Sequence, residues 1–532
     1  MKFETNFLFL SKLKNLNIRN IMKFIRWSCG RNSIGENTHM KKIDKILQIS
    51  KRRGFVFPGS EIYGGLSGTF DFGPLGFLLR KKLIEYWRDF FVKSDDNIFE
   101  IESSLIMPEK VFEASGHLKG FIDPITKCKN CKNVFRADNL IEEMTKLFVE
   151  GLGIEELTRI IREKDLRCPK CGGELEDVKV FNLMFSMNVG ALGDTTGYLR
   201  PETAQGIFVN FKNILVATRA KLPFGVAQIG KSFRNEISPR QWLIRMREFT
   251  QAEIEFFINP QETSYEKLRD YENVKIRVLS REAQKAGKSE EEMTVREALE
   301  KGIIPSEYMA YFLAKEQLFY ESLGIPKEAI RFRHMLPEET PHYSKGNVDM
   351  EILFDFGWKE VVGNAYRSDY DLKRHSEYSK TDLSYVLDNG TKIIPHVVEP
   401  SFGIERTIYA ILLYSFVEDR ERGWDWFKFS SKIAPISVAV FPLLNKEEMI
   451  KKAWDVYKLV KRNFDSLFDK SGSIGKRYAR ADEIGVPYTI TIDYQTLEDN
   501  TVTIRDRDTM QQKRVEINKL IERLNDFLKV KE

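Results

Sequence analysis

The chain has 532 residues, more than the roughly 250 to 300 at which one hydrophobic core stops growing, so we expect two or more domains. Hydrophobic residues make up 42% of the chain, and no apolar run approaches the roughly 18 residues that span a bilayer. This composition excludes a membrane-spanning protein and indicates a soluble globular one with no membrane partner.

The net charge of +5 lies at the amino terminus, because residues 1–39 hold seven lysines and arginines against Glu4 and Glu36. A nucleic acid must therefore be bound by a local basic patch of the remaining, nearly neutral chain. Residues 1–39 are basic, partly apolar and poor in acids, as organellar transit peptides are. The alternative is that Met40 is the true start. We treat residues 1–39 as an N-terminal extension, transit-like or mis-assigned, outside the fold.

After the glycine- and aromatic-rich residues 55–71, apolar residues recur at helical spacing from Leu78 to Phe91. Pro74 precedes them, where its fixed φ suits the first turn of a helix. We expect a loop or hairpin that leads into an amphipathic helix.

Four cysteines form two pairs, Cys128-x-x-Cys131 and Cys168-x-x-Cys171. Two such pairs supply the four thiolates of a closed, structural Zn²⁺ site, whereas the alternative is four unrelated thiols. We expect a zinc-ribbon-like insertion over residues 125–180 with a helix between the pairs. Five cysteines do not indicate a secreted disulfide framework, so a reducing compartment such as the cytoplasm is expected.

Two short strand-like stretches, residues 225–233 and 249–258, flank a polar loop and predict an antiparallel pair. Four arginines stand beside four glutamates across the loop and the second stretch, in the text SFRNEISPRQWLIRMREFTQAEIEFF. One interpretation is an exposed ladder of ion pairs. The other is a single sheet surface that holds a phosphate chain with arginines and stacks a base on Phe249.

A later text, HVVEPSFGIERTIYAILL, places Arg406 at the start of a strongly apolar helix. An arginine there suits a bound phosphate, and Gly403 permits close backbone approach, although an arginine that merely snorkels is the alternative. Residues 261–335 are charged and predict a helical insertion. After about Trp426, strands such as residues 436–443 and 488–493 alternate with helices, which indicates a small α/β domain.

The motifs PLG, FRNE and EPSFGIER resemble, in order, the three signatures of class II aminoacyl-tRNA synthetases. RPETAQG, FRNEISPR and EPSFG together resemble the dimeric glycyl-tRNA synthetase family, and IGKRYARADEIGVPYTITID resembles its anticodon-binding domain. The resemblance runs from about Lys41 to the end. The related enzymes for proline, threonine or serine share the ATP arginines but not RPETAQG with EPSFG. A non-catalytic relative would usually lack those arginines.

The resemblance implies an α+β fold with a six- or seven-stranded antiparallel sheet flanked by helices. The catalytic domain would span residues 40–425, with the four-cysteine insertion and the helical insertion, and the α/β anticodon-binding domain residues 430–532. It implies a homodimeric ligase that converts glycine and ATP to glycyl-adenylate and transfers glycine to the 3′ end of tRNA(Gly). Its location would be cytoplasmic, or organellar if residues 1–39 are a transit peptide.

The resemblance also implies a role for each matching residue. Arg234 would hold the α-phosphate and Arg406 the γ-phosphate as the catalytic pair, Phe249 would stack on adenine, and Glu360 would bind Mg²⁺ with ATP. The implied ATP site consists of Arg234, Asn235, Glu236, Arg245, Met246, Phe249, Glu360, Val361, Gly403 and Arg406. The implied glycine site consists of Arg136, Glu202, Glu253, Glu399 and Ser401. The implied anticodon contacts are Lys476, Arg477, Tyr478, Arg480, Arg505 and Arg507. No protein nucleophile or general base is implied.

Overall fold

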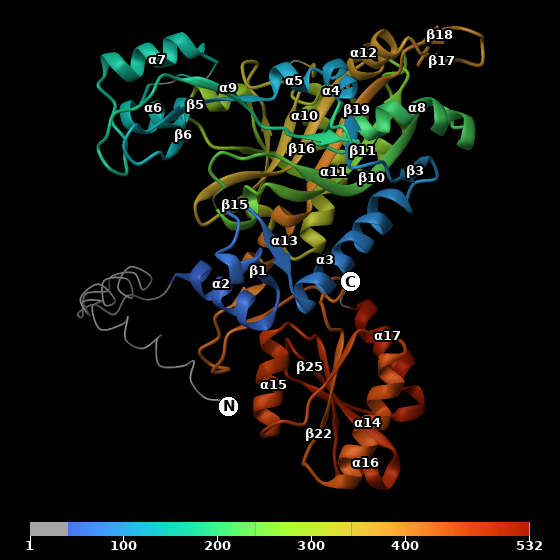
Figure 1. The fold of residues 1–532 in the computed structure, drawn as a ribbon. Helices are drawn as coiled ribbons and strands as arrows, with labels where there is room; N and C mark the ends of the chain where they lie inside the picture. The colour runs from blue at the N-terminus through green and yellow to red at the C-terminus, as the bar shows by residue number, and fades with distance from the viewer. Residues whose placement is uncertain (1–40, 148, 150, 240, 342, 531–532) are drawn as a thin grey trace, which may run out of the picture. The chain divides into compact units, whose positions relative to one another are not determined.

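Figure 1 shows a computed structural model of the chain, which describes residues 41–147, 149, 151–239, 241–341 and 343–530. The expected N-terminal extension, residues 1–39, lies outside these described residues. Within them, no helix is both long enough and apolar enough to cross a lipid bilayer.

The first described elements confirm the predicted hairpin and helix. α2 (Lys42–Arg53) precedes the antiparallel strands β1 (Val56–Pro58) and β2 (Phe70–Phe72), and α3 (Pro74–Trp87) follows with Pro74 at its first position. A glycine is required at position 76, because a Cβ there would lie 1.8 Å from the carbonyl oxygen of Phe55. The PLG motif therefore lets α3 pack directly against the chain that precedes it.

A nine-stranded sheet forms the centre of the catalytic part, in the order β13-β12-β14-β15-β16-β19-β11-β10-β3. Neighbouring strands are antiparallel except for β12 with β14 and β10 with β3, which are parallel. The strands are β3 (Ile98–Ile101), β10 (Phe224–Phe233), β11 (Glu248–Ile258), β12 (Lys275–Leu279), β13 (Glu291–Thr294), β14 (Ile330–His334), β15 (Val348–Phe354), β16 (Gly357–Ser368) and β19 (His396–Gly403). The predicted antiparallel pair is confirmed as β10 and β11.

The expectation of a helical insertion over residues 261–335 needs correction. The stretch does contain α10 (Val295–Glu300) and α11 (Glu307–Ser322), but its strands β12, β13 and β14 extend one edge of the central sheet. The other six strands match the number that the resemblance implied. The added strands could not be predicted from the sequence because they are short and charged. For example, β12 buries Ile276 and Val278 but exposes Lys275. A strand of five residues is too short to show a clear alternation of apolar and polar residues.

Alternate residues of the central strands face opposite sides of the sheet. On one face, Phe256 of β11 packs on Phe312 of α11 at 5.3 Å between ring centroids, and Phe402 of β19 packs on Trp87 at 5.6 Å. On the other face, α8 (Ala204–Thr218) covers only one end of β11, where its Phe211 ring lies 4.8 Å from Phe257 (Figure 1). Polar side chains of β11 occupy the rest of that face, which is where the candidate site lies.

Two smaller sheets lie between α3 and α8 in sequence. In the cysteine-containing module, β5 (Ile122–Lys127) pairs with β6 (Val134–Arg136) and β7 (Lys179–Asn182). The expected helical content between the cysteine pairs is confirmed as α6 (Ala137–Thr145) and α7 (Ile154–Glu163). The second sheet joins β4 (Ile106–Pro108), β9 (Thr195–Leu199) and β8 (Phe185–Val189), and the chain then runs through Arg200 to Thr203 into α8.

The carboxyl-terminal region is an α/β domain, as predicted. Its sheet has the order β23-β22-β24-β25-β26. Val438 and Val440 of β22 pack with Met449 of α14 (Glu447–Lys461), whereas Ala439 packs with Ala481 of α15 (Ile474–Glu483) on the opposite face (Figure 1). Both faces of the sheet are therefore covered. The remaining elements are β22 (Val438–Pro442), β23 (Ser466–Phe468), β24 (Tyr488–Ile492), α16 (Tyr494–Asp499), β25 (Thr501–Asp506), β26 (Gln512–Glu516) and α17 (Leu520–Val530).

Candidate active site

A cavity on the polar face of β16, β19 and β11 brings together nearly every residue predicted to bind ATP. Its wall consists of Arg234, Glu236, Leu243, Ile244, Arg245, Met246, Phe249, Gln251, Glu360, Val361, Ser401, Gly403, Glu405 and Arg406. Of the predicted ATP residues, Asn235 is outside this wall, and its backbone N–H donates to the carbonyl of Leu183 at 2.7 Å. Arg234, Glu236 and Arg245, in the loop between β10 and β11, therefore line a cavity, and the interpretation as an exposed ladder of ion pairs on two strands is wrong.

Two arginines line this cavity from different parts of the fold: Arg234 directly follows β10, and Arg406 belongs to the helix after β19. The guanidinium of Arg234 stacks on Phe249 with its Cζ 5.2 Å from the ring centroid. Arg406, in the first turn of α13 (Ile404–Ser415), donates to Glu360 at 2.9 Å and to the carbonyl of Ile244 at 3.1 Å. A third arginine, Arg245, pairs with Glu236 at 2.5 Å. Guanidinium groups around an aromatic ring are suited to bind a polyphosphate that is attached to a planar base.

An irregularity in β16 turns Glu360 toward the cavity. Met350 of β15 pairs with Val362, but the next residue, Glu351, pairs with Glu360, so β16 contains one extra residue at Val361. A bulge of this kind reverses which side chains face which side of a sheet. Glu360 can therefore line the same cavity as Gly403, which simple alternation along β16 would not predict.

Beyond the cavity, the same face bears four buried glutamates, Glu202, Glu253, Glu255 and Glu399, called here the glutamate cluster. Glu202 comes from the loop before α8, Glu253 and Glu255 from β11, and Glu399 from β19. Carboxylate oxygens of the last three lie within 4.8 Å of one another. Glu253 accepts a short hydrogen bond from Thr203 and lies opposite Ser401 in the strand ladder.

One buried arginine compensates part of this negative charge. Arg367 is 1% exposed and donates to Glu399 at 2.5 Å and to Asp371 at 2.7 Å, while Glu202 lies 3.7 Å away. Burial raises the pKa of Glu399 well above its usual range despite Arg367. Burial also opposes ionisation of Glu202, but His117 and Arg367 outweigh it and lower its pKa. The surroundings thus favour the carboxylate form of Glu202 and the neutral acid form of Glu399, and a bound cation would favour the ionised form of both.

Comparisons with known proteins identify the family. Over 559 residues, the chain is 42% identical to the glycine–tRNA ligase of Methanothermobacter thermautotrophicus, and the match covers 90% of this chain and 98% of that protein. This chain belongs to the glycine–tRNA ligase family. A similar match, 42% identical, covers 92% of this chain and the full length of the Pyrococcus horikoshii enzyme.

The two parts of the ligase also match separate families. Residues 191–414 match the tRNA synthetase class II core domain (G, H, P, S and T), and residues 437–527 match the anticodon binding domain. A solved prolyl-tRNA synthetase from Cryptosporidium parvum shares the fold, with a TM-score of 0.57 and 14% identity over 94% of this chain and 79% of that chain. The predicted fold class and activity are confirmed: the enzyme activates glycine with ATP and transfers it to tRNA(Gly).

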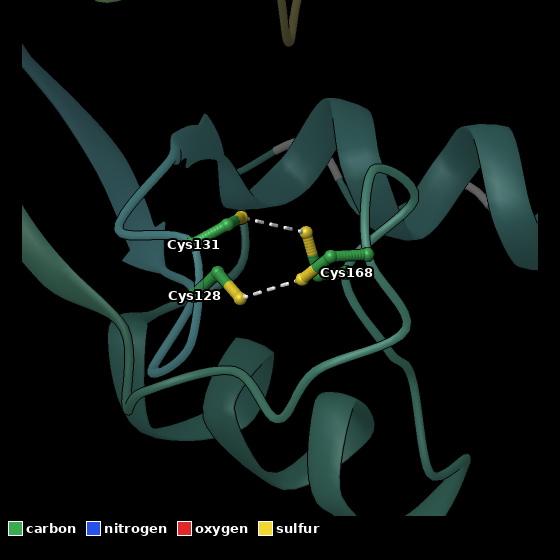
Figure 2. Close-up of side chains that lie close together, drawn as sticks. Cys128, Cys131 and Cys168 are labelled. Atoms are coloured by element: carbon green, nitrogen blue, oxygen red, sulfur yellow. Dashed lines mark hydrogen bonds between the residues drawn. The ribbon is translucent and has the colours of Figure 1, made fainter. Parts of the chain in front are cut away.

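The four predicted zinc ligands of the ligase converge at one point. Figure 2 labels three of them, Cys128, Cys131 and Cys168. Sγ of Cys128 lies 3.5 Å from Cys171, and Sγ of Cys131 lies 3.6 Å from Cys168. These distances are far longer than a disulfide and close to the edge of about 3.8 Å in a tetrahedron with Zn–S bonds of about 2.3 Å. The thiols are thus arranged as a closed four-sulfur site.

The two cysteine turns have the same backbone hydrogen bonds. The N–H of Lys132 donates to the carbonyl of Cys128 at 3.1 Å, and Gly172 donates to Cys168 at 2.8 Å. Both donors have left-handed φ, +59° and +71°. The side-chain amide of Asn133 donates to Cys131 and lowers the pKa of this thiol to about 6, which favours the thiolate that a metal requires.

Arg136, predicted to contact glycine, forms ion pairs with two aspartates that do not belong to the glutamate cluster. It pairs with Asp138 at 2.8 Å and with Asp123 at 3.2 Å, and Asp123 also lies 3.8 Å from Arg245. Arg136 and Arg245 both line a second cavity, together with Lys170 and Pro239. The structure therefore places Arg136 on the ATP side of the site, between the cysteine module and the loop after β10.

Three of the predicted anticodon contacts are internal residues. Arg477, Arg505 and Arg507 are 2%, 4% and 1% exposed. Arg505 donates to both oxygens of Asp482 at 2.9 and 3.0 Å, and the other two donate to backbone carbonyls. The prediction that these three bind the anticodon is wrong, because internal acceptors already engage them. Lys476 is exposed, and Arg480 is half-buried beside Asp469.

Sequence reasoning assigned no role to two members of the buried site. Arg367 follows Gly363 and Ala365 in alternation on β16, where small side chains leave space above the sheet, and Asp371 stands four residues further on. Glu255 follows Glu253 by two residues and so shares its face. Both signals are visible in the sequence, but burial of the charges is decided only by the packing of α8 and α12 (Tyr370–Ser379) over the sheet.

Proposed function

We propose that the cavity and the glutamate cluster are the ATP half and the glycine half of one active site. The observation that supports this most directly is the order of side chains on β11: Phe249 and Gln251 line the cavity, whereas Glu253 and Glu255 belong to the cluster. Alternate residues of a strand are about 7 Å apart. ATP held at Phe249 and glycine held at Glu253 would therefore meet near Gln251. This spacing brings the glycine carboxylate to the α-phosphate of ATP.

In the ATP half, Arg234 binds the α-phosphate, Arg406 binds the γ-phosphate, and Phe249 stacks on adenine. Glu236 and Arg245 also contact ATP, beside Met246, Val361 and Gly403. The ion pair between Arg406 and Glu360 would open when ATP binds, because the γ-phosphate is the stronger partner for a guanidinium fork.

Glu360 fits a Mg²⁺ ion bound together with ATP. Its side chain is 51% exposed at the cavity wall, so one carboxylate and the phosphate oxygens could share the ion. Such an ion would neutralise charge on the phosphates during transfer.

In the glycine half, the ammonium group binds the carboxylates of Glu202 and Glu253, with Ser401 and Glu399 beside them. Glycine has no side chain to recognise, so the space filled by these carboxyls excludes larger amino acids. Arg136, which lies near Arg245, is assigned to the glycine carboxylate or the tRNA end.

The chemistry requires positioning more than proton transfer. The glycine carboxylate attacks the α-phosphorus in line, pyrophosphate leaves, and a hydroxyl of the terminal tRNA ribose then attacks the mixed anhydride. The roles assigned to Arg234 and Arg406 are to orient the triphosphate and stabilise its developing charge. No side chain is assigned as nucleophile or general base.

The decisive test is amino-acid-dependent exchange of pyrophosphate into ATP, measured with each of the twenty amino acids. We expect exchange with glycine and at most about 10% of that rate with alanine or serine, since a pocket that excludes one methylene discriminates by about 10- to 200-fold. Faster exchange with proline, threonine or serine than with glycine would contradict the assignment of the glycine half.

We also propose that Cys128, Cys131, Cys168 and Cys171 hold one structural Zn²⁺ per chain. Native mass spectrometry should find one zinc in the full chain and none in Cys168→Ser, with Cys29→Ser as the control that keeps its metal. Structural zinc contributes on the order of 10 kcal/mol of apparent binding free energy in small domains, so the Cys168→Ser variant should be cleaved by protease within residues 122–182. Iron, or a chain that contains no metal, would contradict the zinc assignment.

The ligase is proposed to be a homodimer through the region around α3. Ile62 and Tyr63 are 89% and 88% exposed, and Leu66 and Phe77 are more than half exposed nearby in sequence. Apolar side chains grouped in this way mark a protein interface. The same native mass measurement should therefore give twice the 62.1 kDa of one chain.

For the other partners, Lys476 and Arg480 are the anticodon-domain residues best placed to meet tRNA phosphates. A cytoplasmic location is proposed because the four clustered cysteines form no disulfide with one another, as expected in a reducing compartment. An organellar location is the alternative if residues 1–39 are a transit peptide, and the mass of the native amino terminus distinguishes the two.

A further inference from the structure

Glu255 is the one member of the glutamate cluster without a hydrogen bond in the described part of the chain. Its side chain is fully buried, yet neither carboxyl oxygen has a partner. Glu202 bonds to Gln205, Glu253 to Thr203, and Glu399 to Arg367. Unpartnered buried carboxyls are costly, so such a group in a native fold indicates a partner that arrives from outside.

The strand ladder aims Glu255 at the site proposed for glycine. Glu253 lies opposite Ser401, and two residues along each strand on the same face bring Glu255 beside Glu399. Oxygens of Glu253, Glu255 and Glu399 lie within 4.8 Å of one another, which is a spacing that one small cation can bridge. The three carboxyls therefore surround a common point at the inner end of the site.

We propose that Glu255 is a specificity-determining residue for glycine: with Glu253 and Glu399 it forms the inner end of the amino-acid site and accepts a hydrogen bond from the bound ammonium group. This inference rests on the proposed glycine half of the site. It assigns to Glu255 a role that the family resemblance did not supply.

The charges around Glu255 make this contact dependent on protons. Burial, reinforced by Glu399, raises the pKa of Glu255 well above its usual range, and Arg367 opposes the shift from β16. Glu253 and Asp371 add further negative charge. In the empty site, this environment therefore favours the neutral acid form of Glu255 over its carboxylate. When an ammonium group enters, the ionised form is favoured, and one proton leaves to solvent for each glycine bound.

The sign of the pH effect follows from that release. Because binding expels a proton, glycine affinity increases as pH rises, by up to tenfold per pH unit, until Glu255 is ionised in the free enzyme. A residue with only a structural role would not change this slope.

The test compares wild-type full-length enzyme with Glu255→Gln, which has the same shape but no negative charge. In glycine-dependent pyrophosphate exchange, we expect the variant to raise KM for glycine by about 10- to 100-fold, as for loss of a charge-assisted hydrogen bond, with KM for ATP unchanged within about twofold. In Glu255→Gln, glycine affinity should rise less steeply with pH than in the wild type. The difference between the two slopes should reach up to tenfold in affinity per pH unit. Glu255→Asp, which keeps the charge, should recover part of the affinity if Glu255→Gln folds poorly.

Glu316→Gln is the matched control. Glu316 is also fully buried and has one unpartnered oxygen, but its carboxylate bonds to Asn364 on the α11 side of the sheet. This variant should keep the wild-type KM and pH slope for glycine. Unchanged KM and slope in Glu255→Gln would overturn the proposal, whereas absence of glycine exchange in the wild type would instead refute the glycine half itself. Mn²⁺ binding that glycine displaces and Glu255→Gln abolishes would assign the three carboxyls to a metal and also overturn it.

Discussion

Arg234→Ala should abolish glycyl-adenylate formation while leaving the fold intact. The guanidinium faces the cavity, stacked on Phe249 and bonded through Nε to the carbonyl of Pro201, so it is held ready for the α-phosphate. Loss of one preorganised donor to a transferring phosphoryl group costs about 10²- to 10³-fold, and loss of an arginine that neutralises transition-state charge costs up to about 10⁵-fold. We expect glycine-dependent pyrophosphate exchange to fall by about 10³-fold at saturating ATP.

The matched control for this variant is Arg331→Ala. Arg331 also stacks on an aromatic ring, with its Cζ 4.4 Å from the centroid of Trp358, but it lies on β14 and outside the cavity wall. Exchange by Arg331→Ala should stay within a few-fold of wild type. Arg234→Lys, which keeps the charge without the planar fork, should be intermediate. Exchange by Arg234→Ala within about tenfold of wild type would show that the α-phosphate lies elsewhere.

Arg367→Met should both destabilise the catalytic part and prevent glycine activation. Removal of one partner from a buried ion pair costs about 3 to 5 kcal/mol, because the remaining carboxylates are left unpaired. Arg367 is 1% exposed and contacts Glu399, Asp371 and Glu202, so we expect the melting temperature to fall by roughly 10 °C. Differential scanning calorimetry of the full chain measures this change.

The loss of stability in Arg367→Met should depend on pH. Without the arginine, the folded-state pKa of Glu399 lies still further above its unfolded value of about 4.3. Between those two values the folded protein binds more protons than the unfolded one, so its stability falls as pH rises. The decrease in melting temperature should therefore be larger at about pH 8 than at about pH 5.5. An equal decrease at both values would argue against buried, unpaired carboxylates.

Arg505→Met separates stability from chemistry. Arg505 is also a buried arginine paired with a carboxylate, Asp482, but it belongs to the anticodon-binding domain. It should lower the melting temperature of that domain while glycine-dependent exchange persists below the transition. Retention of exchange by Arg367→Met under the same conditions would show that Arg367 does not organise the glycine half.

Local chemistry in the sequence was sufficient to predict the family, most residues of the cavity wall and the cluster of four cysteines. Pro74 at a helix start, two Cys-x-x-Cys turns and the strand alternation of β10 and β11 each depend on contacts within a few residues. Dependence on local sequence patterns also explains which predictions were wrong. The strands of residues 261–335 were hidden because each is short and pairs with partners far away in sequence.

The arginines of the final domain show the other limit. Arg477, Arg505 and Arg507 have the composition of a nucleic-acid surface, yet Asp482 and backbone carbonyls hold them inside the domain. Whether a charged residue is solvated, paired or aimed at a ligand depends on what packs over it, which no local pattern reports.

By itself, then, the sequence determined that this protein is a class II ligase for glycine, since the signature motifs lie in order along the chain. Tertiary structure alone decided which charges are buried together. The bulge at Val361 turned Glu360 toward the cavity, and the pairing of β16, β19 and β11 gathered Arg367 and Glu255 with the predicted glutamates. The physical reason is that burial and pairing are set by neighbouring strands and covering helices, which come from segments far apart in the sequence.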